Sequence, residues 1–224
     1  MTTIAKQPTP ARWSLGVTDI TFGDRPLEEV AAAAAGLGFE HLDLVIHSED
    51  YADQDLALAV GDRMSGAARD GWSFPAPLPG PGAWEAMVAA LHRHPTAVVE
   101  PWAGSVCDGL DAIRALRAEV PGVRLLVDTG HAAYRDEDPV QLLPWAAHIQ
   151  LRQAAPGRQQ LLAEEGRVDF VAVFEALDRL DYRGRLTIEY FDIPDYGWGL
   201  EDPVSYASAL AEHLRPLLAR FAPA

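Results

Sequence analysis

Acidic side chains stand at the ends of three apolar segments in the second half of the chain. The segments are residues 97–99 before Glu100, residues 125–127 before Asp128, and residues 186–188 before Glu189. Apolar runs that end in a carboxylate and alternate with helix-like stretches are typical of a parallel α/β barrel, whose sites lie at the strand C-termini. Carboxylates are costly to bury unless they are paired or bind a cation. Several of them on one rim therefore indicate a divalent metal site.

The sequence Asp-Thr-Gly-His at residues 128–131 extends the second of these acids. Gly130 permits a tight turn, so His131 can face the same cavity as Asp128. In the alternative interpretation, Asp128 only caps a helix and His131 is a hydrogen-bonded polar group of the core.

A strict alternation of polar and apolar residues occurs at positions 148–152. It places His148, Gln150 and Arg152 on one face of a strand, which in a barrel would be the inward face of the site. An edge strand with one solvated side is the alternative. Gln150 is informative because an amide oxygen is a hard-metal ligand without charge, which suits Mg²⁺ or Mn²⁺.

Further candidates for substrate binding lie outside these motifs. Arg158 belongs to a charge-rich stretch, residues 154–167, which is expected to be a long loop and could act as a lid that binds a substrate hydroxyl or carboxylate. Trp102 follows Glu100 closely and could line a sugar pocket, and His47 lies near the end of the second predicted strand. A solvated loop and ordinary core packing are the alternatives for these residues.

The elements that would position these residues alternate between strands and helices. Predicted strands cover residues 14–19, 41–46, 72–78, 97–102, 123–128, 148–153 and 185–191. Predicted helices cover residues 25–35, 53–68, 82–94, 108–119, 139–146, 169–180 and 202–220. This alternation predicts a parallel sheet of about seven βα units. A closed barrel and an open doubly wound sheet both have this alternation. The chain lacks a Gly-x-Gly-x-x-Gly or Gly-Lys-Ser/Thr phosphate loop, which disfavours the nucleotide-binding version.

Composition limits the domain organisation and the partners. The 224 residues suffice for one α/β domain, and we expect a mobile tail over residues 1–12 and a single barrel domain over residues 13–224. A net charge of −15 argues against nucleic acid as a partner. The single cysteine, Cys107, rules out an intrachain disulfide. Without an apolar run long enough for a signal peptide or a membrane span, the expected location is the cytoplasm.

The ordered set of motifs resembles the xylose isomerase-like TIM-barrel superfamily of sugar isomerases and epimerases. Beyond the motifs above, it includes Gly-Arg-Val-Asp-Phe at residues 166–170 and Tyr-Arg-Gly-Arg-Leu-Thr-Ile-Glu-Tyr at residues 182–190. The resemblance covers about residues 97–191, and the His-Ile-Gln form is similar to the hydroxypyruvate isomerase branch.

This resemblance implies a ligand set and roles for particular residues. One divalent ion, with Mg²⁺ or Mn²⁺ favoured and Co²⁺ or Zn²⁺ possible, would be bound by Glu100, Asp128, Gln150 and Glu189. Glu100 and Glu189 would also act as acid and base. His131 and an arginine, Arg152 or Arg158, would bind substrate oxygens. His148, Trp102 and His47 are further substrate-binding candidates from their positions in the sequence.

The chain departs from the family pattern in length. Family members usually have eight strands, whereas the stretch between the second predicted strand and Glu100 has room for only one more strand. We therefore expect a shortened barrel, with a pocket that is more open or is completed by a second copy or another subunit.

The leading functional hypothesis is a metal-dependent isomerase or epimerase. Its substrate would be a small hydroxy-carbonyl compound, such as a sugar, keto sugar or sugar acid, and the reaction would pass through an enediolate. One alternative is a metal-dependent lyase or C-glycoside-cleaving enzyme, because the same chemistry can expel a β-substituent. Another is a non-catalytic truncated barrel that serves as a partner subunit. An endonuclease-type phosphodiesterase is disfavoured, because the third predicted strand has no histidine and the chain is acidic.

Overall fold

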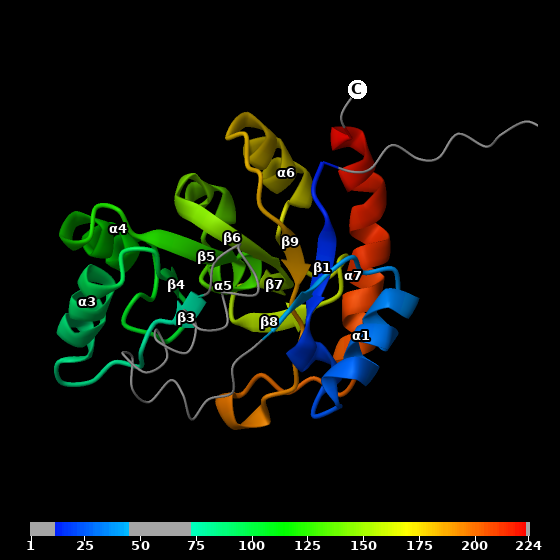
Figure 1. Cartoon of the computed structure of the whole chain (residues 1–224), viewed down its shortest axis with the longest axis horizontal. Helices are drawn as coiled ribbons and strands as arrows, with labels where there is room; N and C mark the ends of the chain where they lie inside the picture. Colours follow the sequence, from blue (N-terminus) through cyan, green and yellow to red (C-terminus); the bar gives the residue numbers. More distant parts are fainter. Residues whose placement is uncertain (1–11, 45–72, 223–224) are drawn as a thin grey trace, which may run out of the picture.

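The computed structural model describes residues 12–44 and 73–222, and in these ranges it contains a curled, wholly parallel sheet (Figure 1). The strands of this sheet are β1 (Leu15–Thr18), β2 (Leu42–Asp43), β3 (Ser73–Pro75), β4 (Val98–Glu100), β5 (Arg124–Asp128), β6 (Ala146–Leu151) and β9 (Leu186–Ile188). Their order is β2-β1-β9-β6-β5-β4-β3, so the last strand pairs with the first. A doubly wound sheet reverses its strand order instead. The circular order confirms the predicted seven-stranded, barrel-type α/β fold.

The described part of the barrel is open between β2 and β3, which form the two edges of the sheet. The segment that connects them, residues 45–72, lies outside the described residues, as do the predicted helix over residues 53–68 and the candidate His47. Of the predicted tail, Arg12 alone is described, and it forms ion pairs with Asp178 and Asp181.

The central strands β1, β5 and β9 are buried because they consist mostly of apolar and β-branched residues on both faces. All residues of β1 and β9 are buried, and so is β5 after its first residue. Sheets of this kind need helices over their outer face. The single cysteine, Cys107, is part of this core, where its burial raises the pKa of the thiol to about 12.

Helices pack around the outside of the sheet (Figure 1). The short α5 (Thr129–Tyr134) follows β5 directly, whereas the outer helices are α1 (Leu27–Gly36), α3 (Ala83–Arg93), α4 (Leu110–Glu119), α6 (Phe170–Arg179) and α7 (Pro203–Leu218). The predicted starts of the last two are confirmed by side-chain caps. Asp169 accepts a hydrogen bond from the backbone N–H of Ala172 at 3.0 Å, and Asp202 accepts one from Ser205 at 3.1 Å. No helix within residues 12–44 and 73–222 is long and apolar enough to cross a membrane.

Two local predictions are wrong. The helix predicted over residues 139–146 is a pair of 3₁₀ turns, η3 (Pro139–Gln141) and η4 (Leu143–Trp145), because Pro144 cannot donate a backbone hydrogen bond inside a helix. The predicted loop over residues 154–167 contains an antiparallel hairpin. Its strands are β7 (Gln153–Ala155) and β8 (Arg158–Leu161), and Gly157 at the turn has a φ of 68°.

Candidate metal centre and substrate cavity

An acid–histidine cluster lies where β4 and β5 end. Nε2 of His131 is 3.6 Å from Oε1 of Glu100 and 3.6 Å from Oδ2 of Asp128. One potential ligand atom from each of these residues lies within 4.8 Å of the other two. The three side chains can therefore reach a single metal ion.

The Asp-Thr-Gly-His sequence forms this cluster through local backbone structure. Oδ1 of Asp128 accepts a hydrogen bond from the N–H of Gly130 at 2.7 Å and so caps α5. The short helix carries His131 back towards the carboxylate. Asp128 is thus both a helix cap and a member of the cluster. A glycine is needed at position 130 because an added Cβ would lie 2.7 Å from Nε of the buried Arg152.

Arg152 places one positive charge within the cluster. Its side chain is fully buried and forms an ion pair with Asp128. Nη2 of Arg152 also donates a hydrogen bond to Nε2 of His131 at 3.2 Å, and the guanidinium lies 4.7 Å from the ring centre of Phe191. Thr129 fixes the backbone of Arg152 through two hydrogen bonds of 2.9 Å. Because Nε2 of His131 accepts a hydrogen bond, the proton of the neutral imidazole belongs on Nδ1.

Burial shifts the pKa values of Glu100, Asp128, Glu189 and His131 towards their neutral forms. Burial and the charge of Asp128 raise the pKa of Glu100 to about 8. Burial and the charge of Glu100 raise the pKa of Glu189 well above its ordinary value. Burial also raises the pKa of Asp128, although Arg152 opposes that shift, and burial with the Arg152 charge lowers the pKa of His131 well below its usual range. A divalent cation would relieve this mutual repulsion of buried carboxylates.

Gln150 and Glu189 extend the donor set along the same edge of the sheet. Gln150 is paired in register with Asp128 on β5 and with Thr187 on β9, two positions before Glu189. Both side chains are buried. Oε1 of Gln150 has no hydrogen-bond partner among the described residues, which is unusual for a buried polar atom. A free amide oxygen beside carboxylates suits a divalent cation, so the residues present fit the metal that the family resemblance implies.

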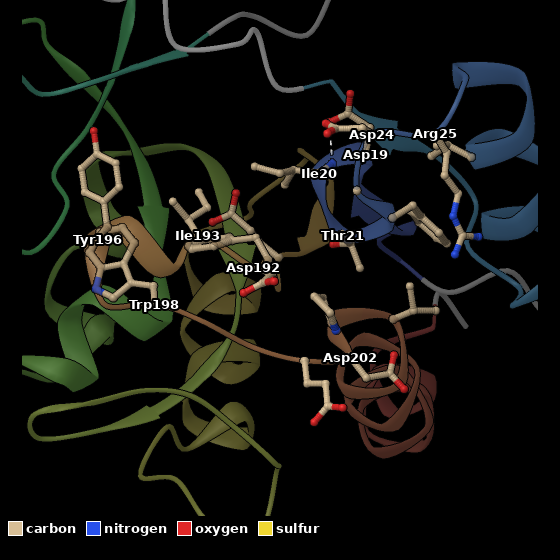
Figure 2. Close-up of a pocket in the computed structure, with 18 of the residues that line it drawn as sticks. Asp19, Ile20, Thr21, Asp24, Arg25, Asp192, Ile193, Tyr196, Trp198 and Asp202 are labelled. Carbon is tan, nitrogen blue, oxygen red and sulfur yellow. Dashed lines mark hydrogen bonds between the residues drawn. The ribbon is translucent and has the colours of Figure 1, made fainter.

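The cluster opens into a cavity of about 850 Å³ (Figure 2). Glu100, His131 and Glu189 belong to its lining. Figure 2 shows Asp19, Ile20, Thr21, Asp24 and Arg25 on one side and Tyr196 and Trp198 on the other. The first group comes from η1 (Asp19–Phe22) and the turn that follows, and the second from the segment between β9 and α7.

An aromatic wall, defined as Trp102, Tyr196 and Trp198, bounds the cavity. The ring centre of Trp198 lies 5.6 Å from that of Trp102, edge to face, and 5.5 Å from that of His131. Sequence reasoning proposed Trp102 but missed Tyr196 and Trp198. The signal that could have found them is Tyr-Gly-Trp at residues 196–198, shortly after a strand that ends in a candidate ligand.

The structure places two other predicted residues away from this cavity. Nε2 of His148 lies 2.5 Å from Oδ2 of Asp43 and 3.3 Å from Oγ1 of Thr187, and it is not part of the cavity lining. Arg158 is exposed at the start of β8 and also lies outside the described lining.

Replacing Arg152 with methionine should strongly destabilise the metal-free protein, because Asp128 loses its buried partner and must stay uncompensated or take up a proton. We expect the free energy of unfolding to fall by about 3–5 kcal/mol, the usual cost of removing one partner from a buried ion pair. Urea unfolding in the presence of a chelator measures the loss. The matched control is Arg114→Met, which breaks an exposed pair with Asp111 and should cost less than about 1 kcal/mol. Equal losses in both variants would contradict the role assigned to Arg152.

The chain belongs to the xylose isomerase-like TIM barrel family, whose sequence pattern matches residues 83–217. The resemblance inferred from the motifs is thereby confirmed. Among curated proteins, the chain is similar to inosose dehydratase of Geobacillus kaustophilus (strain HTA426), with 28% identity over 167 residues, which are 60% of this chain and 53% of the relative. The chain thus spans about half the length of this relative.

Solved structures of the same architecture include sugar epimerases. L-ribulose 3-epimerase matches with a TM-score of 0.66 and 15% identity over 93% of this chain and 96% of that chain. D-allulose 3-epimerase from Methylomonas sp., in complex with D-allulose, has a TM-score of 0.65 and 19% identity over 93% and 98% of the two chains. The IOLI protein with a bound zinc atom has a TM-score of 0.61 and 10% identity over 93% and 99%. At these identities the likeness establishes the fold.

Proposed function

We propose that the protein is a divalent-metal-dependent isomerase or epimerase that moves a proton beside the carbonyl group of a sugar-like hydroxy ketone. The observation that carries the proposal is the cluster of Glu100, Asp128 and His131 at the ends of β4 and β5, beside a cavity that Glu189 also lines. We add Gln150 and Glu189 to the proposed ligand set because they stand at the ends of the neighbouring strands β6 and β9. The names of the similar proteins, two sugar epimerases and an inosose dehydratase, support an enzyme that acts on such compounds.

The oxygen-rich donor set favours Mg²⁺ or Mn²⁺, and the nearby His131 keeps Co²⁺ and Zn²⁺ as candidates. A cation bound by these four residues would polarise the substrate carbonyl and offset the negative charge of the enediolate. Asp128 and Gln150 lie on β5 and β6, which are flanked by β4 and β9 in the sheet. Glu100 and Glu189 therefore lie on opposite sides of the other two ligands.

This arrangement suits proton transfer by the two glutamates. One of them removes the proton from the carbon next to the carbonyl, and the other returns a proton to the adjacent carbon or to the opposite face. In the metal-free protein both carboxyl groups have raised pKa values, so they take up a proton more readily than an exposed glutamate does. His131 lines the cavity, and its ring is proposed to contact a substrate oxygen.

A dehydratase is the second candidate, favoured by the similarity to inosose dehydratase. The first half of the reaction would be the same, because an enediolate can also expel a neighbouring hydroxyl group as water. The second glutamate would then protonate the leaving hydroxyl group instead of carbon.

A panel of keto sugars incubated with the Mn²⁺-loaded protein in D₂O tests and separates these functions. Isomerisation or epimerisation yields a product of unchanged formula that carries deuterium at the protonated carbon. Dehydration yields a product lighter by one water. The absence of product and of deuterium exchange with any divalent metal would overturn both candidates. The partner-subunit hypothesis would then be preferred, and the mass of the chain in solution with and without a full-length relative would test it.

The charge of the cavity narrows the proposed substrate to an uncharged compound. The acids that line its outer part are Asp19, Asp24, Asp192, Glu201 and Asp202. Among the described lining residues, Arg25 is the single arginine or lysine. We expect a keto sugar phosphate to bind about tenfold or more weakly than the free sugar at low salt, with a smaller difference at high salt because salt screens the repulsion. Inhibition constants at two ionic strengths measure this effect, and tighter binding of the phosphate would contradict it.

A further inference from the structure

Gln160 joins the β7–β8 hairpin to the segment that forms one wall of the cavity. Nε2 of Gln160 donates hydrogen bonds of 2.8 Å to the carbonyl oxygens of Phe191 and Trp198, and Oε1 accepts one of 2.8 Å from the N–H of Phe191. The side chain of Gln160 is buried. A single amide group therefore holds both ends of residues 191–198.

Residues 191–198, here called the wall segment, contribute several side chains to the cavity lining, including Ile193, Tyr196 and Trp198. The segment is closed on itself by two backbone hydrogen bonds of 3.2 Å between Ile193 and Trp198. At one end the ring of Phe191 lies against the Arg152 guanidinium, and at the other end Trp198 packs on His131. The position of this segment thus decides how the aromatic side chains meet the acid–histidine cluster.

The backbone of Gln160 is unusual for a strand residue. Its φ is 56°, in the left-handed region that side chains other than glycine rarely adopt. This conformation accompanies the burial of both Gln160 and its neighbour Leu161. Such costly conformations persist only where the surroundings fix them, and they are concentrated at functional sites.

A second contact ties the same hairpin to the end of β9. The hydroxyl group of Tyr190 donates a hydrogen bond to the carbonyl oxygen of Leu161 at 2.7 Å and accepts one from the N–H of Gln153 at 3.2 Å. Tyr190 is fully buried. The hairpin is therefore fixed relative to the sheet, which makes it a rigid support for the wall segment.

We propose that Gln160 is a positioning residue that holds the wall segment in place and keeps Trp198 against His131. Its effect on substrate binding rests on the proposed function, whereas its effect on the wall segment does not. The hairpin, which lies outside the parallel sheet, would thereby shape the substrate cavity without touching the substrate.

The variant Gln160→Glu tests this proposal, because it keeps the shape and the acceptor of the side chain but loses the donor for two carbonyl groups. We expect faster amide hydrogen exchange in a peptide covering residues 191–198 and unchanged exchange in α4. For the Mn²⁺-loaded enzyme we expect KM for the best keto sugar to rise about tenfold or more, with little change in kcat, because binding loses the preformed wall. Gln160→Met, whose side chain has a similar volume and no amide, should show the same changes in amide exchange and in KM as Gln160→Glu. Gln141→Glu adds the same charge at an exposed position and should change neither quantity.

Unchanged exchange in residues 191–198 of a folded Gln160 variant would overturn the proposal. Faster amide hydrogen exchange in residues 191–198 with an unchanged KM would show that Gln160 is merely structural. That result would also overturn its proposed role in positioning the cavity wall. If the Glu variant exchanges faster everywhere, it has lost its fold, and the Met variant decides. If the wild type converts no keto sugar, the proposed function fails, and the exchange result alone decides whether Gln160 holds the wall segment.

Discussion

Exchanging either Glu100 or Glu189 for glutamine should abolish turnover of the keto sugar while leaving the fold intact. The amide cannot accept or return the proton, and loss of a positioned acid or base typically lowers kcat by about 10²–10⁴-fold. Steady-state kinetics with the Mn²⁺-loaded variants measures the effect. Glu201→Gln is the matched control, because Glu201 lines the outer cavity and has no role in proton transfer. Retained activity in both the Glu100 and the Glu189 variants would remove the proposed mechanism.

The substitution Glu189→Gln should also make the stability of the metal-free protein less dependent on pH. The pKa of Glu189 is raised in the folded state, so its contribution to stability is present at low pH and is lost as pH rises from its unfolded pKa to its folded pKa. Glu100 and Asp128 act in the same direction, whereas the lowered pKa of His131 acts oppositely and only at acidic pH. Urea unfolding with a chelator at about pH 7 and about pH 9 measures this loss, and the buried Cys107 thiol contributes equally in the wild type and the variant. Between these two pH values, we expect the free energy of unfolding to decrease less in Glu189→Gln than in the wild type. An equal decrease in both proteins would contradict the burial of Glu189 beside other carboxylates.

The wild-type protein should bind about one divalent ion per chain after Mn²⁺ loading, and the double variant Asp128→Asn, Glu189→Gln should bind none. These substitutions remove two carboxylates from a site whose remaining donors are Glu100, Gln150 and His131, and neutral amides are far weaker ligands than carboxylates for a hard cation. Elemental analysis measures the metal content. A double variant of exposed acids, Asp111→Asn, Glu201→Gln, serves as the control and should bind as much metal as the wild type.

Metal binding should also stabilise the fold, which gives a second test that does not depend on activity. A ligand that binds only the folded state at a concentration 100 times its Kd adds about 2.7 kcal/mol to the free energy of unfolding. We expect Mn²⁺ to raise the stability of the wild type and to leave the double variant unchanged. A wild type without metal and without this stabilisation would mean that the cluster is no metal centre, and the partner-subunit hypothesis would then replace the enzymatic one.

The strands and the acids at their ends could be predicted from the sequence because their signals are local. The apolar residues before Asp128 lie in β5, those before Glu189 form β9, and those before Glu100 lie in β4 apart from Ala97. The cluster of Asp128 with His131 follows from the Gly130 turn, although the structure shows the helix cap and the cluster together, where the sequence offered them as alternatives. Parallel strands then bring acids from distant parts of the chain to one edge.

The features that could not be predicted depend on contacts between distant segments. The β7–β8 hairpin is polar and carries no strand-like apolar alternation, although Pro156-Gly157 is a turn signal that indicates a hairpin in retrospect. The burial of Gln160 reflects its hydrogen bonds to residues 191–198, which no spacing in the sequence reveals. Trp198 shares no regular spacing with the other tryptophans, and its contact with His131 exists only in the folded chain.

The pairing of the first and last strands has a consequence for biosynthesis. β1 is wholly buried, and in the finished protein Leu15 pairs with Leu186 of β9. During translation at about 5–20 residues per second, β1 therefore waits many seconds with one edge unpaired. An unpaired apolar edge invites pairing with other nascent chains. The ring-like strand order thus delays completion of the sheet until most of the chain has been made, and we expect slow refolding after dilution from denaturant.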